Sequence, residues 1–176
     1  GNFFSFERAR INPDMVVLSK SIGGFGLPMA ILLMKPELDL WKPAEHNGTF
    51  RGCNLSFVGA TAGINYNIEH NINQNVLENA KYIENYINEK IISKIPEVEL
   101  RGIGLIWGID FSKLGNDNIV KYIIKECFDN GLIIEAAGRK DLVLKILPPL
   151  IINKDELKEG LDIINEASQK VYKKVK

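Results

Sequence analysis

The sequence predicts an α/β protein built of two units, and three features of its pattern indicate this class. Two short apolar runs, at residues 14–18 and 29–34, are typical of strands that are covered on both faces of a sheet. Apolar residues then recur at helical spacing over residues 55–94. After Pro96, shorter strand and helix candidates alternate. This order predicts an α/β layer followed by a smaller α+β unit, with a boundary within residues 85–97.

The first unit is predicted to carry two strands and two helices. Its first strand ends at Lys20 and leads into a glycine cluster at residues 23–26. A helix is predicted over residues 55–70, with Asn54 placed to cap its start. The longest apolar stripe follows at residues 73–94 and stops before a proline, which predicts the second helix.

The boundary divides the chain into residues 1–90 and 91–176. The second unit is predicted to combine short strands with two helices. Asn153 or Lys154 lies near the start of the closing helix, and lysines gather at its other end, where they suit the helix dipole. The predicted elements are a strand pair or one strand broken by glycines at 98–111, a helix at 119–128, strands at 132–135 and 142–146, and a helix at 155–171.

Composition and charge exclude several classes of protein. The chain has 176 residues, of which 45% are hydrophobic, so it can bury a core and is not a disordered segment. Its 22 basic residues balance 22 acidic ones. This balance argues against nucleic acid or an anionic membrane as a partner, and it favours small molecules or other proteins.

The cysteines and the start of the chain bear on its location and completeness. Cys53 and Cys127 stand far apart with no CxxC spacing, so neither a disulfide framework nor a metal site is expected, and a cytoplasmic location fits. The chain shows no signal peptide and no apolar run long enough to span a membrane. It does not open with Met, so we expect a fragment of a longer protein.

Lys20 is the first candidate for chemistry. It follows a predicted buried strand, at the end where open α/β sheets place their ligands. Partial desolvation there would favour a neutral amine, which is a nucleophile. The alternative is a solvated lysine in a turn at the end of the strand, and position alone does not separate the two.

The segment from His46 to Gly52 is the second candidate. It is polar, and it stands just before the predicted helix at residues 55–70. The hydroxyl of Thr49, backbone amides and Arg51 at a helix N-terminus would form a cradle for a phosphate group. An ordinary capping loop remains the alternative, and His46 is expected to be a hydrogen-bonded loop residue rather than a base.

Gly102, Gly104 and Gly108 do not predict a nicotinamide site. Their spacing is GxGxxxG, and the segment continues as a strand instead of opening a helix. These glycines are interpreted as breaks in the predicted strand.

Several segments, taken in order, carry a resemblance to a known family. They are residues 1–7, 13–20, 23–24, 27–29, 46–52 and 148–150. Together they resemble the class III pyridoxal-phosphate-dependent aminotransferases, and the resemblance extends over essentially the whole chain. Within that class, the segments LSKSIGGFGLPM, KPELD and EHNGTFRG look most like the subfamily that transaminates L-2,4-diaminobutyrate in ectoine biosynthesis.

The resemblance implies a fold-type I, pyridoxal-phosphate-dependent transferase, of which this chain would hold the end of the large cofactor-binding domain and the C-terminal small α+β domain. Lys20 would bind pyridoxal 5'-phosphate through its amine and would shuttle a proton during the reaction. Thr49 would hydrogen-bond the cofactor phosphate across the interface of a homodimer. The aspartate, the aromatic ring and the glycine-rich loop that complete such a site in the family precede the segment where this chain starts. We therefore expect the chain alone to be inactive.

Two positions depart from the family pattern. Cys53 stands where many members carry Asn, and packing is the expected role for a buried cysteine there. Lys145 stands where many members carry a carboxylate-binding arginine; it can still bind a substrate carboxylate, though as a point charge. The alternative is a solvated strand face, since Val143 and Lys145 share one face while Leu144 and Ile146 share the other.

The implied reaction transfers the terminal amine of L-2,4-diaminobutyrate to 2-oxoglutarate, giving L-aspartate 4-semialdehyde and L-glutamate. The partners would be amino acid and 2-oxo acid substrates and a second copy of the chain. Another class III enzyme for ω-amino acids, of the ornithine, acetylornithine or 4-aminobutyrate type, is the first alternative, because it would share the lysine and threonine motifs. A non-catalytic module for dimerisation or binding is the second.

Overall fold

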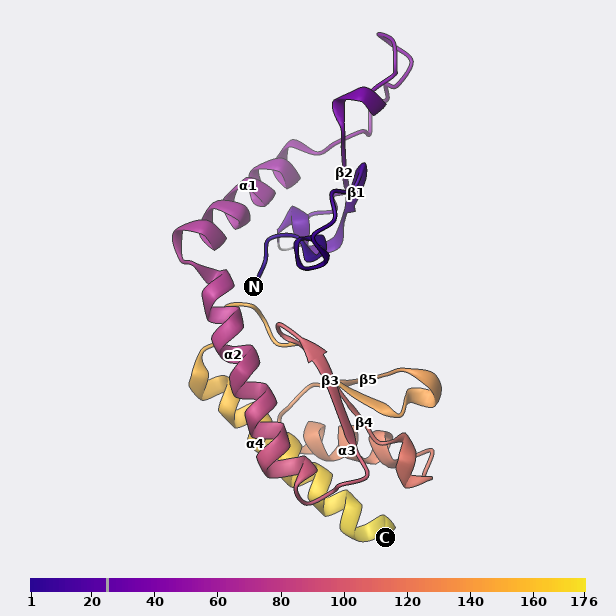
Figure 1. Cartoon of the computed structure of the whole chain (residues 1–176), viewed down its shortest axis with the longest axis vertical. Helices are drawn as coiled ribbons and strands as arrows, with labels where there is room; N and C mark the ends of the chain where they lie inside the picture. Colours follow the sequence, from indigo (N-terminus) through magenta and orange to yellow (C-terminus); the bar gives the residue numbers. More distant parts are fainter. Residues whose placement is uncertain (25) are drawn as a thin grey trace. The chain divides into compact units, whose positions relative to one another are not determined.

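The computed structural model describes residues 1–24 and 26–176, and the chain forms two compact units (Figure 1). One unit comprises Asn2–Asn73 and the other Gln74–Lys176 together with Gly1. Phe25, which belongs to the predicted glycine cluster, lies outside the described residues. The predicted boundary between residues 85 and 97 stays a prediction.

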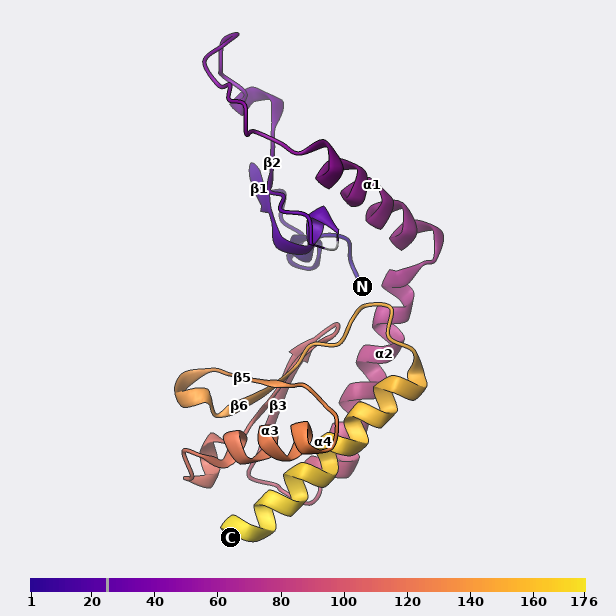
Figure 2. The same ribbon diagram turned by 180° about the vertical axis from the view of Figure 1, so that it is seen from behind.

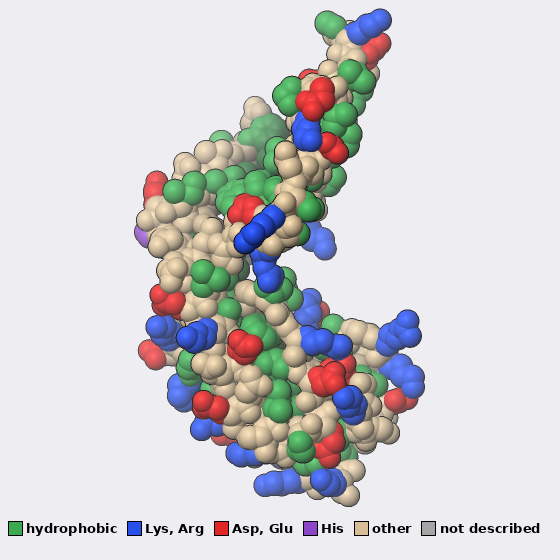
Figure 3. Space-filling view, viewed as in Figure 1, with side chains coloured by type: hydrophobic (Ala, Val, Ile, Leu, Met, Phe, Trp, Pro, Cys, Tyr) green, Lys and Arg blue, Asp and Glu red, His purple; other side chains and the backbone are tan. Residues whose placement is uncertain are grey.

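The Asn2–Asn73 unit contains both strands that the apolar runs predict. Strand β1 (Met15–Leu18) pairs antiparallel with β2 (Ile31–Met34), with Met15 opposite Met34 and Leu18 opposite Ile31. The expectation that both faces of these strands are covered was wrong, because Val17 is 74% exposed. A ribbon of two strands cannot cover its own faces. Figure 3 shows hydrophobic side chains on the surface of this unit.

Helix α1 (Asn54–Glu69) confirms the first predicted helix. Cys53 occupies the N-cap position and Asn54 is the first helical residue, so the prediction of Asn54 as the cap was wrong. The buried side chains of α1 are the small ones of Ser56 and Ala60, while Leu55 is 68% exposed. The helix therefore packs through small residues rather than through the apolar stripe that predicted it.

The Gln74–Lys176 unit is built on one antiparallel sheet of four strands in the order β3-β4-β6-β5. Helices α3 and α4 pack against each other, and both views show them side by side (Figures 1 and 2). The strands are β3 (Glu99–Ile103), β4 (Ile106–Asp110), β5 (Glu135–Ala137) and β6 (Val143–Ile146), and the helices are α2 (Ile72–Ile87, which begins in the preceding unit), α3 (Ile119–Asp129) and α4 (Lys154–Val175).

The core of this unit confirms the predicted apolar patterns. In α2 the stripe includes Val76 and Ile83, which are buried, and a π-helical turn at Asn88–Ile92 carries it on to buried Ile91. The closing helix is capped by Asn153, whose Oδ1 accepts a hydrogen bond from the N–H of Glu156 at 2.9 Å. No helix among the described residues combines the length and apolar character needed to cross a membrane.

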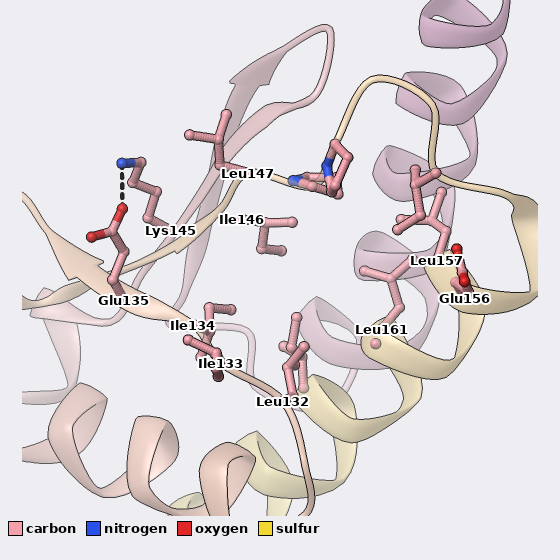
Figure 4. A pocket seen from close by; sticks show the side chains of 15 residues that line it. Leu132, Ile133, Ile134, Glu135, Lys145, Ile146, Leu147, Glu156, Leu157 and Leu161 are labelled. Carbon is pink, nitrogen blue, oxygen red and sulfur yellow. Dashed lines mark hydrogen bonds and ion pairs between the residues drawn. The ribbon is translucent and has the colours of Figure 1, made fainter. Parts of the chain in front are cut away.

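One strand lies later in the chain than predicted. Strand β5 begins at Glu135, not at Leu132, and residues 132–134 belong to no ladder. The pairing of β5 with β6 stops at Glu135 opposite Lys145. Beyond that pair the two chain segments line opposite walls of a cavity, as Figure 4 shows. The apolar run at 132–134 therefore lacks the partner strand that it would need for a ladder.

Candidate functional site

Lys20 lies two residues after β1, as the first residue of a 3₁₀ turn over Lys20–Gly23. Its side chain is exposed, so the expected partial burial was wrong: β1 belongs to a ribbon of two strands whose residues are at most half-buried. Among the described residues its amine makes no ion pair. The Lys20 amine is thus accessible and forms no ion pair with any described residue.

The backbone of Lys20 is left-handed, with φ of 60°. This conformation costs a residue with a side chain about 1–2 kcal/mol, and it persists only where the surroundings hold it. The surrounding turn is held tightly, because a Cβ on Gly59 of α1 would lie 2.8 Å from the carbonyl oxygen of Gly23. The hydroxyl of Ser56 on the same helix donates to the carbonyl of Pro28 at 3.0 Å. Helix α1 therefore supports the loop that carries Lys20.

Thr49 lies in the exposed loop before α1, in the same unit as Lys20. Its hydroxyl makes no hydrogen bond to any residue that the structure describes. The loop is organised around His46, whose ring stacks on Trp41 at 4.6 Å and whose carbonyl accepts a hydrogen bond from the Arg51 guanidinium. His46 thus lies in the loop, held by its stacked ring and its backbone carbonyl, and the predicted hydrogen bond of its ring is not seen among the described residues.

A cavity of about 900 Å³ lies beside this loop. Trp41, His46 and Arg51 line it, together with Val17 of β1 and Phe57 of α1. Neither of the two predicted cofactor-binding residues of this unit is among its lining residues.

Lys145 lies in the other unit, on β6, with its side chain 32% exposed. Its Nζ is 2.5 Å from Oε1 of Glu135, its register partner on β5. The predicted alternation is confirmed, because Leu144 and Ile146 are buried while Lys145 is half-buried. Lys145 is therefore neither free in solvent nor unpaired.

Glu135 is a residue that the sequence reasoning missed. It lines, with Lys145, a cavity of about 410 Å³ with mostly apolar walls (Figure 4). Opposite charges directly across two neighbouring strands are a known pairing signal. The sequence does not fix the register of the two strands, so this signal alone does not place Glu135 opposite Lys145.

The two cysteines lie in opposite environments. Cys53 is exposed, so its predicted role as a buried packing residue was wrong. The backbone N–H and hydroxyl of Ser56, followed by the N–H of Leu55, lower the pKa of the Cys53 thiol. Burial raises the pKa of the Cys127 thiol to about 11, as suits a core residue. Within residues 1–24 and 26–176, no group of three or more His, Cys, Asp or Glu side chains is arranged to hold a metal ion.

Curated relatives match almost the whole chain. The diaminobutyrate–2-oxoglutarate transaminase of Oceanobacillus iheyensis is 48% identical over 176 residues, which are 99% of this chain and 40% of that protein. The enzymes of the same name from Virgibacillus pantothenticus and Wolinella succinogenes are 48% and 46% identical over 99% and 98% of this chain. This chain spans 42% and 40% of their lengths, so it corresponds to about two-fifths of each relative.

Solved structures show the same fold. An ornithine aminotransferase from Toxoplasma gondii, reported with partial occupancy of PLP at its active site, matches with a TM-score of 0.89 and 19% identity over 99% of this chain and 41% of that one. A PLP-bound aminotransferase mutant from Vibrio fluvialis matches with a TM-score of 0.84 and 25% identity over 99% of this chain and 41% of that one. The predicted α/β, fold-type I architecture is confirmed.

The family profile "Aminotransferase class-III" matches residues 1–168. That match takes in the strand end with Lys20, the loop with Thr49 and the strand with Lys145. The chain therefore belongs to the class III aminotransferase family.

Proposed function

We propose that this chain is the lysine-bearing part of a pyridoxal-phosphate-dependent transaminase. The complete enzyme transfers the terminal amine of L-2,4-diaminobutyrate to 2-oxoglutarate and releases L-aspartate 4-semialdehyde and L-glutamate. The observation that carries the proposal is the identity of 46–48% to three enzymes named diaminobutyrate–2-oxoglutarate transaminase, over nearly the whole chain.

Pyridoxal 5'-phosphate is the cofactor of this family, and the residues of the Asn2–Asn73 unit fit part of its site. Lys20 offers an exposed amine with no ion pair among the described residues, at a strained position next to a tightly packed turn. Thr49 offers a hydroxyl that bonds to no described residue. When bound, the cofactor supplies the electron-withdrawing ring that allows a carbon–hydrogen bond beside nitrogen to ionise.

Each of the three predicted site residues has a separate task in this proposal. Lys20 holds the cofactor through its amine and, once released, accepts and returns a proton as the neutral base. Thr49 donates a hydrogen bond to a phosphate oxygen. Lys145 attracts a substrate carboxylate as a point charge, and to do so it must share or exchange its contact with Glu135.

Further assignments follow from the same proposal. The complete enzyme is a homodimer in the cytoplasm, with Thr49 of one chain serving the cofactor of the other, and its product feeds ectoine biosynthesis. This chain spans about two-fifths of its curated relatives, and in the proposal the parts that it does not span supply the remaining cofactor contacts, so the chain alone is inactive. Exposed apolar side chains such as Phe50, which is 100% exposed, fit a surface that other parts of the enzyme cover.

The test is a comparison of amine donors with the complete enzyme that contains this chain. With 2-oxoglutarate as acceptor, L-2,4-diaminobutyrate should give the highest kcat/KM among diaminobutyrate, ornithine, acetylornithine and 4-aminobutyrate. Glutamate formation and loss of activity on removal of the cofactor complete the assay. A higher kcat/KM with any of the other three donors would reassign the substrate.

A further inference from the structure

The ion pair of Lys145 and Glu135 places a positive and a negative group side by side at the edge of an apolar cavity. The two residues are register partners on β6 and β5, and their charged atoms are 2.5 Å apart. Glu135 is the more exposed partner, with 67% of its side chain accessible against 32% for Lys145. Its carboxylate can therefore move with less loss of packing than the lysine amine.

The charged side chains that line the cavity include more acidic residues than basic ones. Three charged side chains line it: Lys145, Glu135 and Glu156 at the start of α4. Figure 4 shows the first two pointing toward each other on one side, with Glu156 on the opposite side. The other lining residues are mostly apolar, among them Leu132, Ile146 and Leu161. The cavity thus holds one cationic and two acidic side chains among mostly apolar ones.

We infer that Lys145 and Glu135 together recognise the head group of an α-amino acid, with the lysine binding its α-carboxylate and Glu135 its α-ammonium. The inference rests on the proposed function, in which the terminal amine of the substrate reacts and its other end must be held. The substrate class is then an α,ω-diamino acid, and Glu135 is a specificity-determining residue.

Electrostatics separates this class from simple ω-amino acids. An α-amino acid head group is itself a neighbouring pair of opposite charges, so it can insert beside Lys145 and Glu135 with every charge opposite its counterpart. A substrate whose head group is a carboxylate alone would pair with Lys145. Glu135 would then lose its partner and lie beside a second negative charge. The cavity as a whole would add a second repulsive carboxylate, Glu156.

Two substrates that differ only in the α-amine provide the kinetic test. L-2,4-Diaminobutyrate and 4-aminobutyrate have the same carbon chain and the same terminal amine. In the complete enzyme, Glu135→Gln should lower kcat/KM for diaminobutyrate by about tenfold or more, as loss of a charge-assisted contact implies. It should leave kcat/KM for 4-aminobutyrate unchanged or raise it. Lys145→Ala should lower both.

The matched control is Glu99→Gln. Glu99 lies on β3 of the same sheet, is not among the residues that line the cavity, and forms an ion pair with Lys113 of the following turn, so this variant removes the same charge and one ion pair. It should leave the ratio of the two kcat/KM values unchanged. An equal change for both substrates in Glu135→Gln, or no change for diaminobutyrate, would overturn the inference.

A binding measurement tests the inference without turnover. L-2-Aminobutyrate carries the full head group and butyrate only the carboxylate. Calorimetric titration of the cofactor-free complete enzyme should show tighter binding of L-2-aminobutyrate, and Glu135→Gln should abolish that preference. Equal affinity of the wild type for both ligands contradicts the role of Glu135. Absence of transamination with diaminobutyrate would contradict the proposed function instead, and the titration would still decide the inference.

Discussion

The indole of Trp107 occupies the space where a side chain on Gly102 would begin. The two residues are register partners in the β3–β4 hairpin, and a Cβ on Gly102 would lie 2.3 Å from Cδ2 of Trp107. Trp107 is buried, and its Nε1 donates to the carbonyl of Gly104 at 2.7 Å. Gly102 is thus explained by packing inside the β3–β4 ladder, and its interpretation as a break in the strand was wrong. The break falls at Gly104, which lies in the turn between the two strands with φ of 55°.

Gly102→Ala should therefore destabilise the protein. The added methyl group must displace the indole or open the hairpin, and overpacking of this kind costs about 1–3 kcal/mol. The measurement is the midpoint of thermal unfolding of the complete enzyme. Gly63→Ala on α1 is the control, because a Cβ there meets nothing within 4 Å. Equal midpoints for the two variants would show that the hairpin accommodates the methyl group.

Lys20 should carry the cofactor in the complete enzyme. Reduction with borohydride followed by peptide mapping should find the label on Lys20, since its amine is accessible and makes no ion pair among the described residues. Lys20→Ala should abolish turnover and keep the fold, because an exposed lysine contributes little packing. Lys42→Ala, an exposed lysine of the same unit, should retain activity. A label on another lysine refutes the assignment.

Thr49→Ala should weaken cofactor retention. The loss of one charge-assisted hydrogen bond to phosphate corresponds to about 1.5–3 kcal/mol. Dialysis followed by measurement of bound cofactor reports the change. Thr61→Ala is the matched control, because the Thr61 hydroxyl donates to the carbonyl of Phe57 within α1 at 2.8 Å. Unchanged retention in Thr49→Ala would identify its loop as an ordinary capping loop.

Lys145→Ala should raise KM for carboxylate-bearing substrates. A half-buried charge-assisted contact contributes about 1.5–3 kcal/mol to transition-state binding. Lys145→Arg should recover only part of it, since the planar guanidinium needs a wider approach than an ammonium. Lys113→Ala, in the turn after β4 and exposed in an ion pair with Glu99 of β3, should behave as wild type. Steady-state kinetics within about twofold of wild type for Lys145→Ala would assign Lys145 to a solvated face.

Local pattern was sufficient to predict most elements of the fold. The stripes that predicted α2, α3 and α4 are the faces that the structure buries, as at Ile83, Ile123 and Leu161. The cap of α4 at Asn153 was also predictable, because an N-cap side chain bonds to an amide only three residues away. Such features depend on neighbours in the sequence, so the sequence alone determined them.

Short motifs in the sequence also predicted the family, but they did not predict whether their residues are buried or exposed. Lys20 was expected to be partly buried and Cys53 to be packed, yet both are exposed. Exposure depends on which layers cover a strand or a helix end, and the residues of the β1–β2 ribbon are at most half-buried. The sequence pattern of a single strand does not indicate whether another layer of secondary structure covers that strand.

Pairing between distant segments was decided by tertiary structure alone. The run at 132–134 has the composition of a strand, but its neighbour diverges from it after Glu135, so no ladder forms there. The same divergence brings Glu135 against Lys145 at the edge of the cavity. Which charge faces which depends on the register of two strands separated by a loop, and register is set by the packing of the whole sheet rather than by either strand.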